Sequence, residues 1–341
     1  MTERATQPLM ALRGLTVDFD IGERFVRALH GVDLTLERGE TLGLVGESGC
    51  GKSITWLAAL GLLGRSTRVG GSAKFEGREL VGMPERRLAE VRGGRAALIF
   101  QDPASALNPV QRIGRQIGEA LRLHRGLTGR AARAEAARLL DRVGISNAGQ
   151  RLNEYPHELS GGMNQRAMIA MALAGEPDLL IADEPTTALD ATIQAQILDL
   201  LREIRDETGM ALVLISHDLG VIADMADRVA VMYSGRVVEL AEARRLFASP
   251  AHPYTRGLMA ALPEIEGPKR RLEAIPGSVP PPHLLPSGCA FAARCPHVGG
   301  ICEAAPPPLR TVPGEPLRLA ACARLEALRP APTAARRRVE A

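Results

Sequence analysis

The sequence has few aromatic residues and no strong excess of either charge. Aromatic side chains make up 3% of the 341 residues, and 42 basic residues are nearly balanced by 39 acidic ones, which gives a net charge of +3. A nucleic-acid-binding surface built from basic side chains interleaved with aromatic rings is therefore not expected. The composition predicts no nucleic acid partner.

Long hydrophobic runs and a secretion signal are also missing. No apolar stretch approaches the ~20 residues of a membrane-spanning helix, and the first residues, MTER, are not those of a signal peptide. Hydrophobic and charged contents of 45% and 24% are typical of a globular protein, and the length suits one large or two modest domains. We expect a cytoplasmic chain that does not span the membrane but is able to dock onto a membrane complex.

Residues 46–53, GESGCGKS, match the phosphate-binding pattern G-x-x-x-x-G-K-[ST]. An apolar run, 41–45, precedes the pattern, and a helical pattern, 54–60, follows it. Glycines let such a loop turn several N–H groups toward one anion, and the helix N-terminus adds partial positive charge. Lys52 supplies a full charge for the β- and γ-phosphates, and the Ser53 hydroxyl supplies a ligand for Mg²⁺. The loop predicts nucleotide binding but not the use of the nucleotide.

Further polar residues follow apolar runs that read as core strands. The run 179–182 ends in Asp183, suited to hold Mg²⁺ through a water, and Glu184, suited to act as general base on an attacking water. Gln101 and His217 each follow another such run. Because ligands bind at the carboxyl ends of parallel strands, we expect these side chains to face one crevice.

Strands alternate with helical patterns along the first 250 residues. Period-2 alternation in the early strands predicts partly antiparallel pairing, and residues 229–239, split by Ser234-Gly235, read as a hairpin. The fold class is therefore α/β, with a mixed sheet and a helical subdomain at about 102–176.

The composition changes near residue 250. Sixteen of the 24 prolines lie from Pro253 onward, and the runs 280–282 and 306–308 forbid long helices there. We predict a cassette domain over 1–250, a small Pro/Cys-rich domain over 251–330 and a flexible tail over 331–341.

Residues 159–166, LSGGMNQR, decide between the uses of a nucleotide. With this stretch the chain resembles the ATP-binding-cassette (ABC) family, whose signature LSGGQ is met except at Met163. The phosphate loop, Gln101, the signature, the Asp183-Glu184 strand, the D-loop at 188–190 and His217 follow in the family's order. The resemblance covers about residues 10–250.

The resemblance implies that ATP is sandwiched between two cassettes, each signature helix closing over the γ-phosphate held by the other chain. It assigns hydrolysis to Glu184, His217, Lys52 and Gln101, and Mg²⁺ to Ser53, Gln101 and Asp183. It assigns ATP contacts to the following residues: Phe25, which would stack on adenine, Gly46, Ser48, Gly49, Cys50, Gly51, Lys52, Ser53, Ile54, Ser160, Gly161, Gly162 and Asp190. Cys50 occupies a variable loop position, where a thiol would be open to alkylation.

Further stretches resemble one branch, the dipeptide/oligopeptide importer ATPases. They include the signature's Met form, residues 99–109, and residues 251–258, AHPYTRGL; residues 107–117 are similar to the D-type subunit. The resemblance implies a heterodimer with an F-type ATPase, two transmembrane permease subunits and an extracytoplasmic peptide-binding protein, with this chain peripheral on the cytoplasmic face of the membrane. Nickel or glutathione import by the same ATPase type, and a soluble ABC ATPase acting on nucleic acid or ribosomes, are the alternatives.

Four cysteines, Cys289, Cys295, Cys302 and Cys322, are spaced C-x5-C-x6-C-x19-C. A cytosolic setting argues against disulfides, and four thiolates suit zinc or an iron–sulfur cluster. Structural zinc favours tighter pairs, and residues 286–296 resemble the C-terminal domain of dipeptide-importer ATPases, some of which carry a [4Fe–4S] cluster. We expect such a cluster, structural or regulatory in role; zinc and unmetallated thiols stay open.

Overall fold

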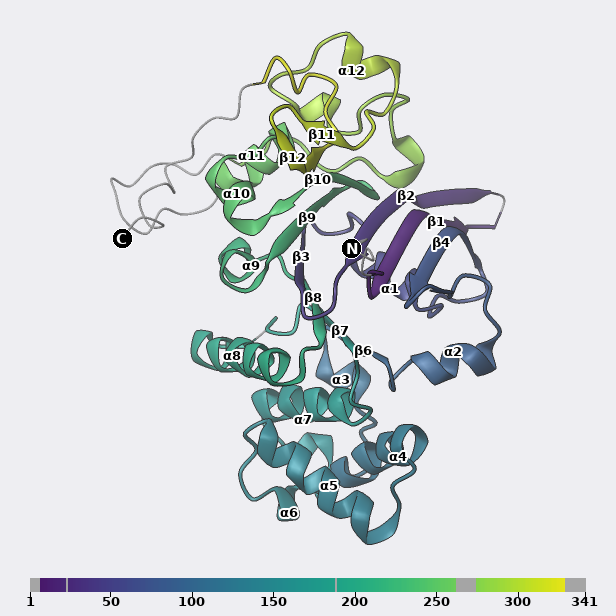
Figure 1. The fold of residues 1–341 in the computed structure, drawn as a ribbon, viewed down its shortest axis with the longest axis vertical. Coiled ribbons are helices and arrows are strands. Elements are labelled where there is room, and N and C mark those ends of the chain that lie inside the picture. Colours follow the sequence, from purple (N-terminus) through teal and green to yellow (C-terminus); the bar gives the residue numbers. More distant parts are fainter. Residues whose placement is uncertain (1–6, 23, 188, 262–273, 329–341) are drawn as a thin grey trace, which may run out of the picture. The chain divides into compact units, whose positions relative to one another are not determined.

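The computed structural model describes residues 7–22, 24–187, 189–261 and 274–328 (Figure 1). The chain forms two compact units. The first contains Leu36–Glu40 and Gly82–Ile215, and the second contains Met10–Thr35, Thr41–Val81 and the residues from Ser216 onward. No helix in the described ranges is long and apolar enough to cross a bilayer.

One sheet of the second unit is antiparallel (Figure 1). Its strands are β1 (Met10–Asp20), β2 (Phe25–Leu36), β4 (Thr67–Phe75) and β5 (Arg78–Glu79), in the order β2-β1-β4-β5. β1 pairs antiparallel with β4, and buried side chains alternate with more exposed ones along β2 from Val32 to Leu36. The predicted antiparallel pairing is confirmed for β1 and β4.

The phosphate-loop strand lies in another sheet segment of the same unit. β3 (Thr41–Val45), buried throughout, pairs in parallel with β9 (Arg228–Tyr233), and β9 pairs antiparallel with β10 (Arg236–Glu242). Ser234 and Gly235 turn this hairpin with φ values of 43° and 72°, the left-handed region that a tight hairpin turn requires. The predicted hairpin is confirmed, and the pairing of parallel with antiparallel strands makes the sheet mixed, as expected for the fold class.

Four helices complete this part of the unit: α1 (Lys52–Ala59), α9 (Leu219–Met225), α10 (Ala243–Ala248) and α11 (Pro253–Ala260). A Cβ at Gly43 would lie 2.7 Å from Cγ2 of Ile222. The glycine in β3 therefore lets α9 pack directly on the strand.

The C-terminal residues extend the same sheet segment. β11 (Arg310–Val312) pairs with β12 (Glu315–Ala320), and β12 pairs antiparallel with β10. Arg318 of β12 forms a buried ion pair with Glu239 of β10, with the two side chains 2% and 0% exposed. A buried charge pair at this junction ties the C-terminal strands to the hairpin.

Around these strands the C-terminal segment has only short helical turns: η2 (Pro282–Leu284), η3 (Ala292–Arg294) and α12 (Ile301–Ala304). Long helices are thus missing among the described residues after α11, as the prolines predict. The domain boundary near 250 stays a prediction.

The first unit is built on three buried parallel strands. They are β6 (Ala96–Ile99), β7 (Leu179–Asp183) and β8 (Ala211–Ile215), with β7 paired to both neighbours. Continuous apolar runs are typical of parallel strands covered on both faces. The helices α2 (Glu85–Val91) and α8 (Ala191–Thr208) belong to this unit as well.

The first unit also contains a group of helices, and the bounds of the expected helical subdomain stay a prediction. The group comprises α3 (Pro103–Ala106), α4 (Ile113–Arg125), α5 (Gly129–Arg142), α6 (Ala148–Arg151), η1 (Pro156–Glu158) and α7 (Gly161–Leu173). The helices pack through apolar faces at helical spacing, for example Ile113, Ile117 and Leu121 of α4. Figure 1 shows α4, α5 and α7 gathered into one helical layer.

Candidate functional site

The phosphate-binding pattern forms a tight loop between β3 and α1, both in the second unit. Gly46 has a φ of +148°, and a Cβ there would lie 2.2 Å from the carbonyl oxygen of Met232 in β9. Gly51 has a φ of +104° and caps α1 in a left-handed conformation. These two glycines are required because the backbone conformation and the close approach to β9 exclude a side chain.

Ser48 and Gly49 form the exposed crest of the loop, while Ser53 and Ile54 lie half-buried in the first turn of α1. The Nζ atom of Lys52 donates to the carbonyl oxygens of Gly46, at 2.8 Å, and Glu47, at 3.3 Å. The lysine ammonium therefore lies against the loop, where a helix N-terminus and backbone N–H groups can receive phosphate oxygens. Binding of phosphate by these loop residues stays a prediction.

Cys50 is fully buried in the loop. Burial raises the pKa of its thiol, and the nearby Lys52 only partly opposes that effect. A buried thiol with a raised pKa is a poor nucleophile. The expectation that this thiol is open to alkylation is therefore wrong, and the contact of Cys50 with ATP stays a prediction.

Glu47 has contacts that the sequence did not predict. Its backbone N–H donates to the hydroxyl of Tyr254 in α11 at 2.8 Å. Its carboxylate accepts two hydrogen bonds from Arg294 in η3, at 2.7 and 2.9 Å. The only feature of the sequence that pointed to these contacts was a charged residue inside a glycine-rich loop.

Phe25, the candidate adenine partner, begins β2 and is 41% exposed. The guanidinium of Arg68 lies 3.6 Å from the centre of its ring. An exposed ring with a cation on its face suits stacking on a base. Stacking of adenine on Phe25 stays a prediction.

His217, also in the second unit, follows β8 along the chain and is exposed. The next residue, Asp218, caps α9 by accepting hydrogen bonds from the backbone N–H groups of Gly220 and Val221. The cap fixes the start of α9 next to the exposed His217, and the contact of His217 with a γ-phosphate stays a prediction.

The predicted hydrolytic residues Gln101 and Glu184 meet in the first unit. The Gln101 amide and the Thr187 hydroxyl each donate to Oε2 of Glu184 at 2.9 Å. Glu184 follows β7 with a φ of +48°, an unusual conformation for a residue with a side chain. Such strained positions concentrate at functional sites, and here two donors fix the carboxylate. Thr187 is a contact that the sequence did not predict.

Other predicted residues of the first unit lie at element ends. Asp183 is the last residue of β7, and Ser160 caps α7 through a 3.3 Å hydrogen bond from the N–H of Met163. Gly161 is exposed and Gly162 half-buried in the first turn of α7. The N-terminus of α7 is therefore accessible at Gly161, as a second phosphate site requires.

Asp190 caps α8, accepting from the N–H groups of Thr192 and Ile193 at 3.0 Å. This capping explains the residue structurally, and its contact with ATP stays a prediction. Within the predicted D-loop, Ala188 lies outside the described residues.

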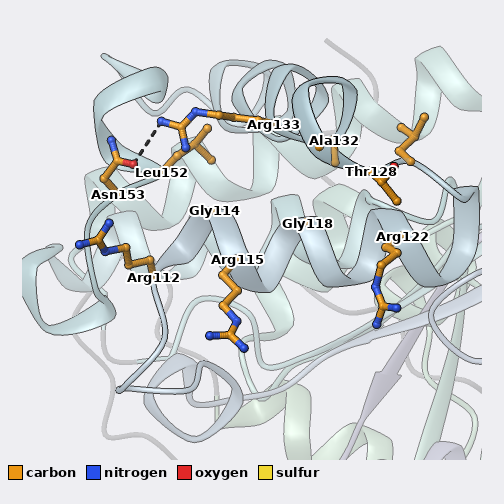
Figure 2. Close-up of a pocket in the computed structure, with 12 residues that line it drawn as sticks. Arg112, Gly114, Arg115, Gly118, Arg122, Thr128, Ala132, Arg133, Leu152 and Asn153 are labelled. Atoms are coloured by element: carbon orange, nitrogen blue, oxygen red, sulfur yellow. Dashed lines mark hydrogen bonds between the residues drawn. The ribbon is translucent and has the colours of Figure 1, made fainter.

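A groove of about 390 Å³ lies along α4 in the helical part of the first unit (Figure 2). Gly118 leaves part of this helix face open, whereas Gly114 packs directly against Leu152, and Figure 2 shows Arg115 and Arg122 projecting from the same side of α4. Arg112 and Arg133 also line the groove. The surface is basic and concave, and suits an acidic partner segment.

The four C-terminal cysteines are free thiols that line one pocket together with His252 and Phe291. Burial raises the pKa of Cys289, Cys295 and Cys322, and the neighbouring thiols add to the effect. The sulfurs of Cys295 and Cys322 accept backbone N–H hydrogen bonds from His297 and Arg324 at 3.4 Å. In the described part of the chain, no group of three or more His, Cys, Asp or Glu side chains is arranged to hold a single metal ion.

Residues 29–187 match a family described as "ABC transporter", and residues 238–302 match one described as "Oligopeptide/dipeptide transporter, C-terminal region". The oligopeptide transport ATP-binding protein OppD of Salmonella typhimurium is 48% identical over 328 residues, covering 94% of this chain and 97% of that protein. OppD of Escherichia coli is 46% identical over 322 residues, covering 94% of this chain and 95% of that protein. A solved structure, the dimeric post-hydrolysis state of the cassette MJ0796 bound to ADP and Pi, matches with a TM-score of 0.62 and 27% identity, covering 69% of this chain and 99% of that one.

Proposed function

The chain belongs to the ABC transporter family of ATP-hydrolysing subunits, and we propose that it powers the uptake of dipeptides or oligopeptides across the cytoplasmic membrane. The observation that carries the cargo class is the match of residues 238–302 to the C-terminal region of oligopeptide/dipeptide transporters. Near-complete coverage of the OppD relatives supports the same assignment.

In this proposal the loop at 46–53 binds the ATP phosphates through its backbone N–H groups and Lys52. Ser53, Gln101 and Asp183 are the residues that would hold Mg²⁺, which supplies charge neutralisation at the phosphates when bound. Glu184, oriented by Gln101 and Thr187, accepts the proton of the attacking water. His217 donates a hydrogen bond to the γ-phosphate, and Ser160 and Gly162 close over the ATP bound to a partner cassette.

The proposed partners are an F-type ATPase, two permease subunits and an extracytoplasmic peptide-binding protein, which would place this chain peripherally at the inner membrane. The arginine-lined groove along α4 is the proposed docking surface for an acidic, amphipathic segment of a permease. Its charge and concavity support this choice.

Reconstitution tests the function. The chain, expressed with candidate permeases and a second ATPase, is purified and placed in vesicles, and ATP-dependent peptide uptake is measured with and without the binding protein. Peptide uptake that disappears in Glu184→Gln supports the proposal. Uptake of nickel or glutathione alone, or co-purification with RNA that survives high salt, favours the alternative functions.

The docking groove has a separate test with a matched control. A Cβ at Gly118 meets no atom within 4 Å, so Gly118→Trp fills the groove without a clash at its base. Ala134→Trp adds the same ring to an exposed position of α5 that does not line the groove. We expect only Gly118→Trp to lose co-purification with the permeases while ATP binding is kept; equal retention by both variants would contradict the docking surface.

The cysteine pocket is proposed to hold a [4Fe–4S] cluster with a structural or regulatory role. Four thiols on one pocket and two backbone N–H bonds to sulfur support this proposal. Zinc and unmetallated thiols are the alternatives for this pocket.

Anaerobic purification followed by iron and sulfide analysis tests the cluster. About four irons per chain and broad visible absorbance are expected. Cys302→Ser should lower the iron content, whereas Cys50→Ser, outside the pocket, should keep it. A colourless, iron-free anaerobic sample would rule out the cluster and leave zinc or unmetallated thiols, which zinc analysis of the same sample distinguishes.

A further inference from the structure

Glu47 is the residue of the phosphate loop with the most contacts to the C-terminal segment. Its N–H donates to Tyr254, its carboxylate pairs with Arg294, and its carbonyl oxygen accepts from Lys52. The donor and acceptor groups of this one residue are thus all engaged. Two of the partners lie beyond residue 250, outside the part of the chain that matches the cassette family.

Arg294 is itself held from several sides. Its side chain is 5% exposed, against 30% for Glu47, and its Nε donates to the carbonyl oxygen of Pro276 at 2.8 Å. Its Nη1 donates to the hydroxyl of Tyr233 at 3.4 Å, and its guanidinium carbon lies 5.8 and 5.9 Å from the ring centres of Tyr233 and Phe291. These contacts hold the guanidinium independently of Glu47, which suits it to a bidentate ion pair with that carboxylate.

Tyr254 is equally constrained. It is fully buried, and its ring lies 4.7 Å from that of Tyr233 and 5.4 Å from that of Phe291, centre to centre. Burial raises the pKa of the Tyr254 hydroxyl, so the group stays neutral and able to accept from the Glu47 N–H. The rings of Tyr233 and Phe291 thus pack against both Tyr254 and Arg294, the two residues that bond to Glu47.

We propose that Arg294 and Tyr254 are positioning residues for the phosphate-binding loop, so that the C-terminal segment sets the ATP affinity of the cassette. The inference rests on ATP binding by this loop, as in the proposed function. Neither residue touches the nucleotide; both act through Glu47. The loop crest at Ser48 and Gly49 is exposed, so the hydrogen bonds of the adjacent Glu47 hold the loop from its buried side. Restraining a binding loop before the ligand arrives strengthens affinity by lowering the entropy lost on binding.

The test is equilibrium titration of the full-length chain with ATP and Mg²⁺. Arg294→Met removes the clamp, and we expect the Kd for ATP to rise about tenfold, in line with the loss of a charge-assisted bidentate pair. Tyr254→Phe removes a single hydroxyl and should raise the Kd about threefold. In the assembled transporter, KM for ATP should rise in parallel while kcat at saturating ATP stays within about twofold, because bound nucleotide orders the loop itself.

Arg310→Met is the matched control. Arg310 makes a bidentate pair with Glu326 in the same C-terminal segment, at 2.8 and 3.0 Å, without touching the loop. This variant should bind ATP like the wild type. The double variant Arg294→Met with Glu47→Gln should bind ATP no more weakly than Arg294→Met alone, because both changes remove the same interaction.

A folded Arg294→Met variant with wild-type Kd and KM would overturn the proposal. If that variant fails to fold, Tyr254→Phe and Glu47→Gln decide instead, and wild-type affinity in both would overturn it. If the wild-type chain binds no ATP, the proposed function fails, which is a result distinct from failure of the inference.

Discussion

His252 is expected to make the protein sensitive to mild acid. The residue is 2% exposed and caps α11, with its Nδ1 accepting from the backbone N–H of Tyr254 at 3.0 Å. Burial lowers the pKa of His252 from 6.5 to about 4; a hydrogen bond with the backbone of Ala321 opposes the shift, and Arg256 adds to it. The folded protein therefore keeps this imidazole neutral at pH values where the unfolded chain protonates it.

The sign and size of the effect follow from this difference. Above pH 6.5 His252 is neutral in both states and its titration has no effect on stability. Between pH 6.5 and about 4 the unfolded state binds more protons, so the free energy of unfolding falls as the pH falls. The shift corresponds to a loss of about 2 kcal/mol at pH 5 and about 3 kcal/mol at pH 4.

Urea unfolding of the full chain at pH 7.5, 6 and 5 under reducing conditions measures this loss. His252→Asn keeps an acceptor at the helix cap but does not titrate, so its unfolding free energy should fall by about 2 kcal/mol less than that of the wild type between pH 7.5 and 5. His283→Asn, at an exposed position, should follow the wild type. Burial also lowers the pKa of His30 to about 4. Because His30 is present in both proteins, its contribution cancels when the wild type is compared with His252→Asn. Parallel pH curves for wild type and His252→Asn would refute the reasoning.

Three further predictions concern the nucleotide site and the C-terminal junction. Glu184→Gln should lower ATP turnover by at least about a hundredfold while ATP binding persists, because the amide cannot accept the proton of water; normal phosphate release by the variant complex would contradict this. Lys52→Ala should raise the Kd for ATP at least about tenfold through the loss of a charge-assisted phosphate contact, and a titration with unchanged midpoint would count against the loop. Arg318→Met should lower the free energy of unfolding by about 3–5 kcal/mol because it removes the ion-pair partner of the fully buried Glu239; an unchanged thermal melt would exclude that cost.

Local sequence patterns were sufficient for much of the fold. Apolar runs predicted β3, β7 and β8, because parallel strands buried on both faces need no alternation. Ser234-Gly235 predicted the turn between β9 and β10, because the left-handed conformation of a tight hairpin favours such residues. The loop pattern itself predicted where glycine is required, at Gly46 and Gly51.

The reactivity of Cys50 could not be predicted in the same way. Nothing in the local pattern reports that this thiol is buried, because burial depends on how the loop packs in the folded chain. Likewise, the pairing of β12 with β10, which makes the C-terminal segment continue the hairpin sheet, depends on contacts between residues about eighty positions apart.

The sequence by itself determined the family and the chemistry at the phosphate loop, because the motif residues act through local backbone geometry and the order of the motifs. Only the tertiary structure decided that Glu47 pairs with Arg294 and Tyr254, since long-range ion pairs and hydrogen bonds leave no periodic trace in the chain. The same holds for the gathering of four widely spaced cysteines on one pocket. The phosphate loop is thus recognisable from eight consecutive residues, whereas what holds it in place comes from residues more than two hundred positions away.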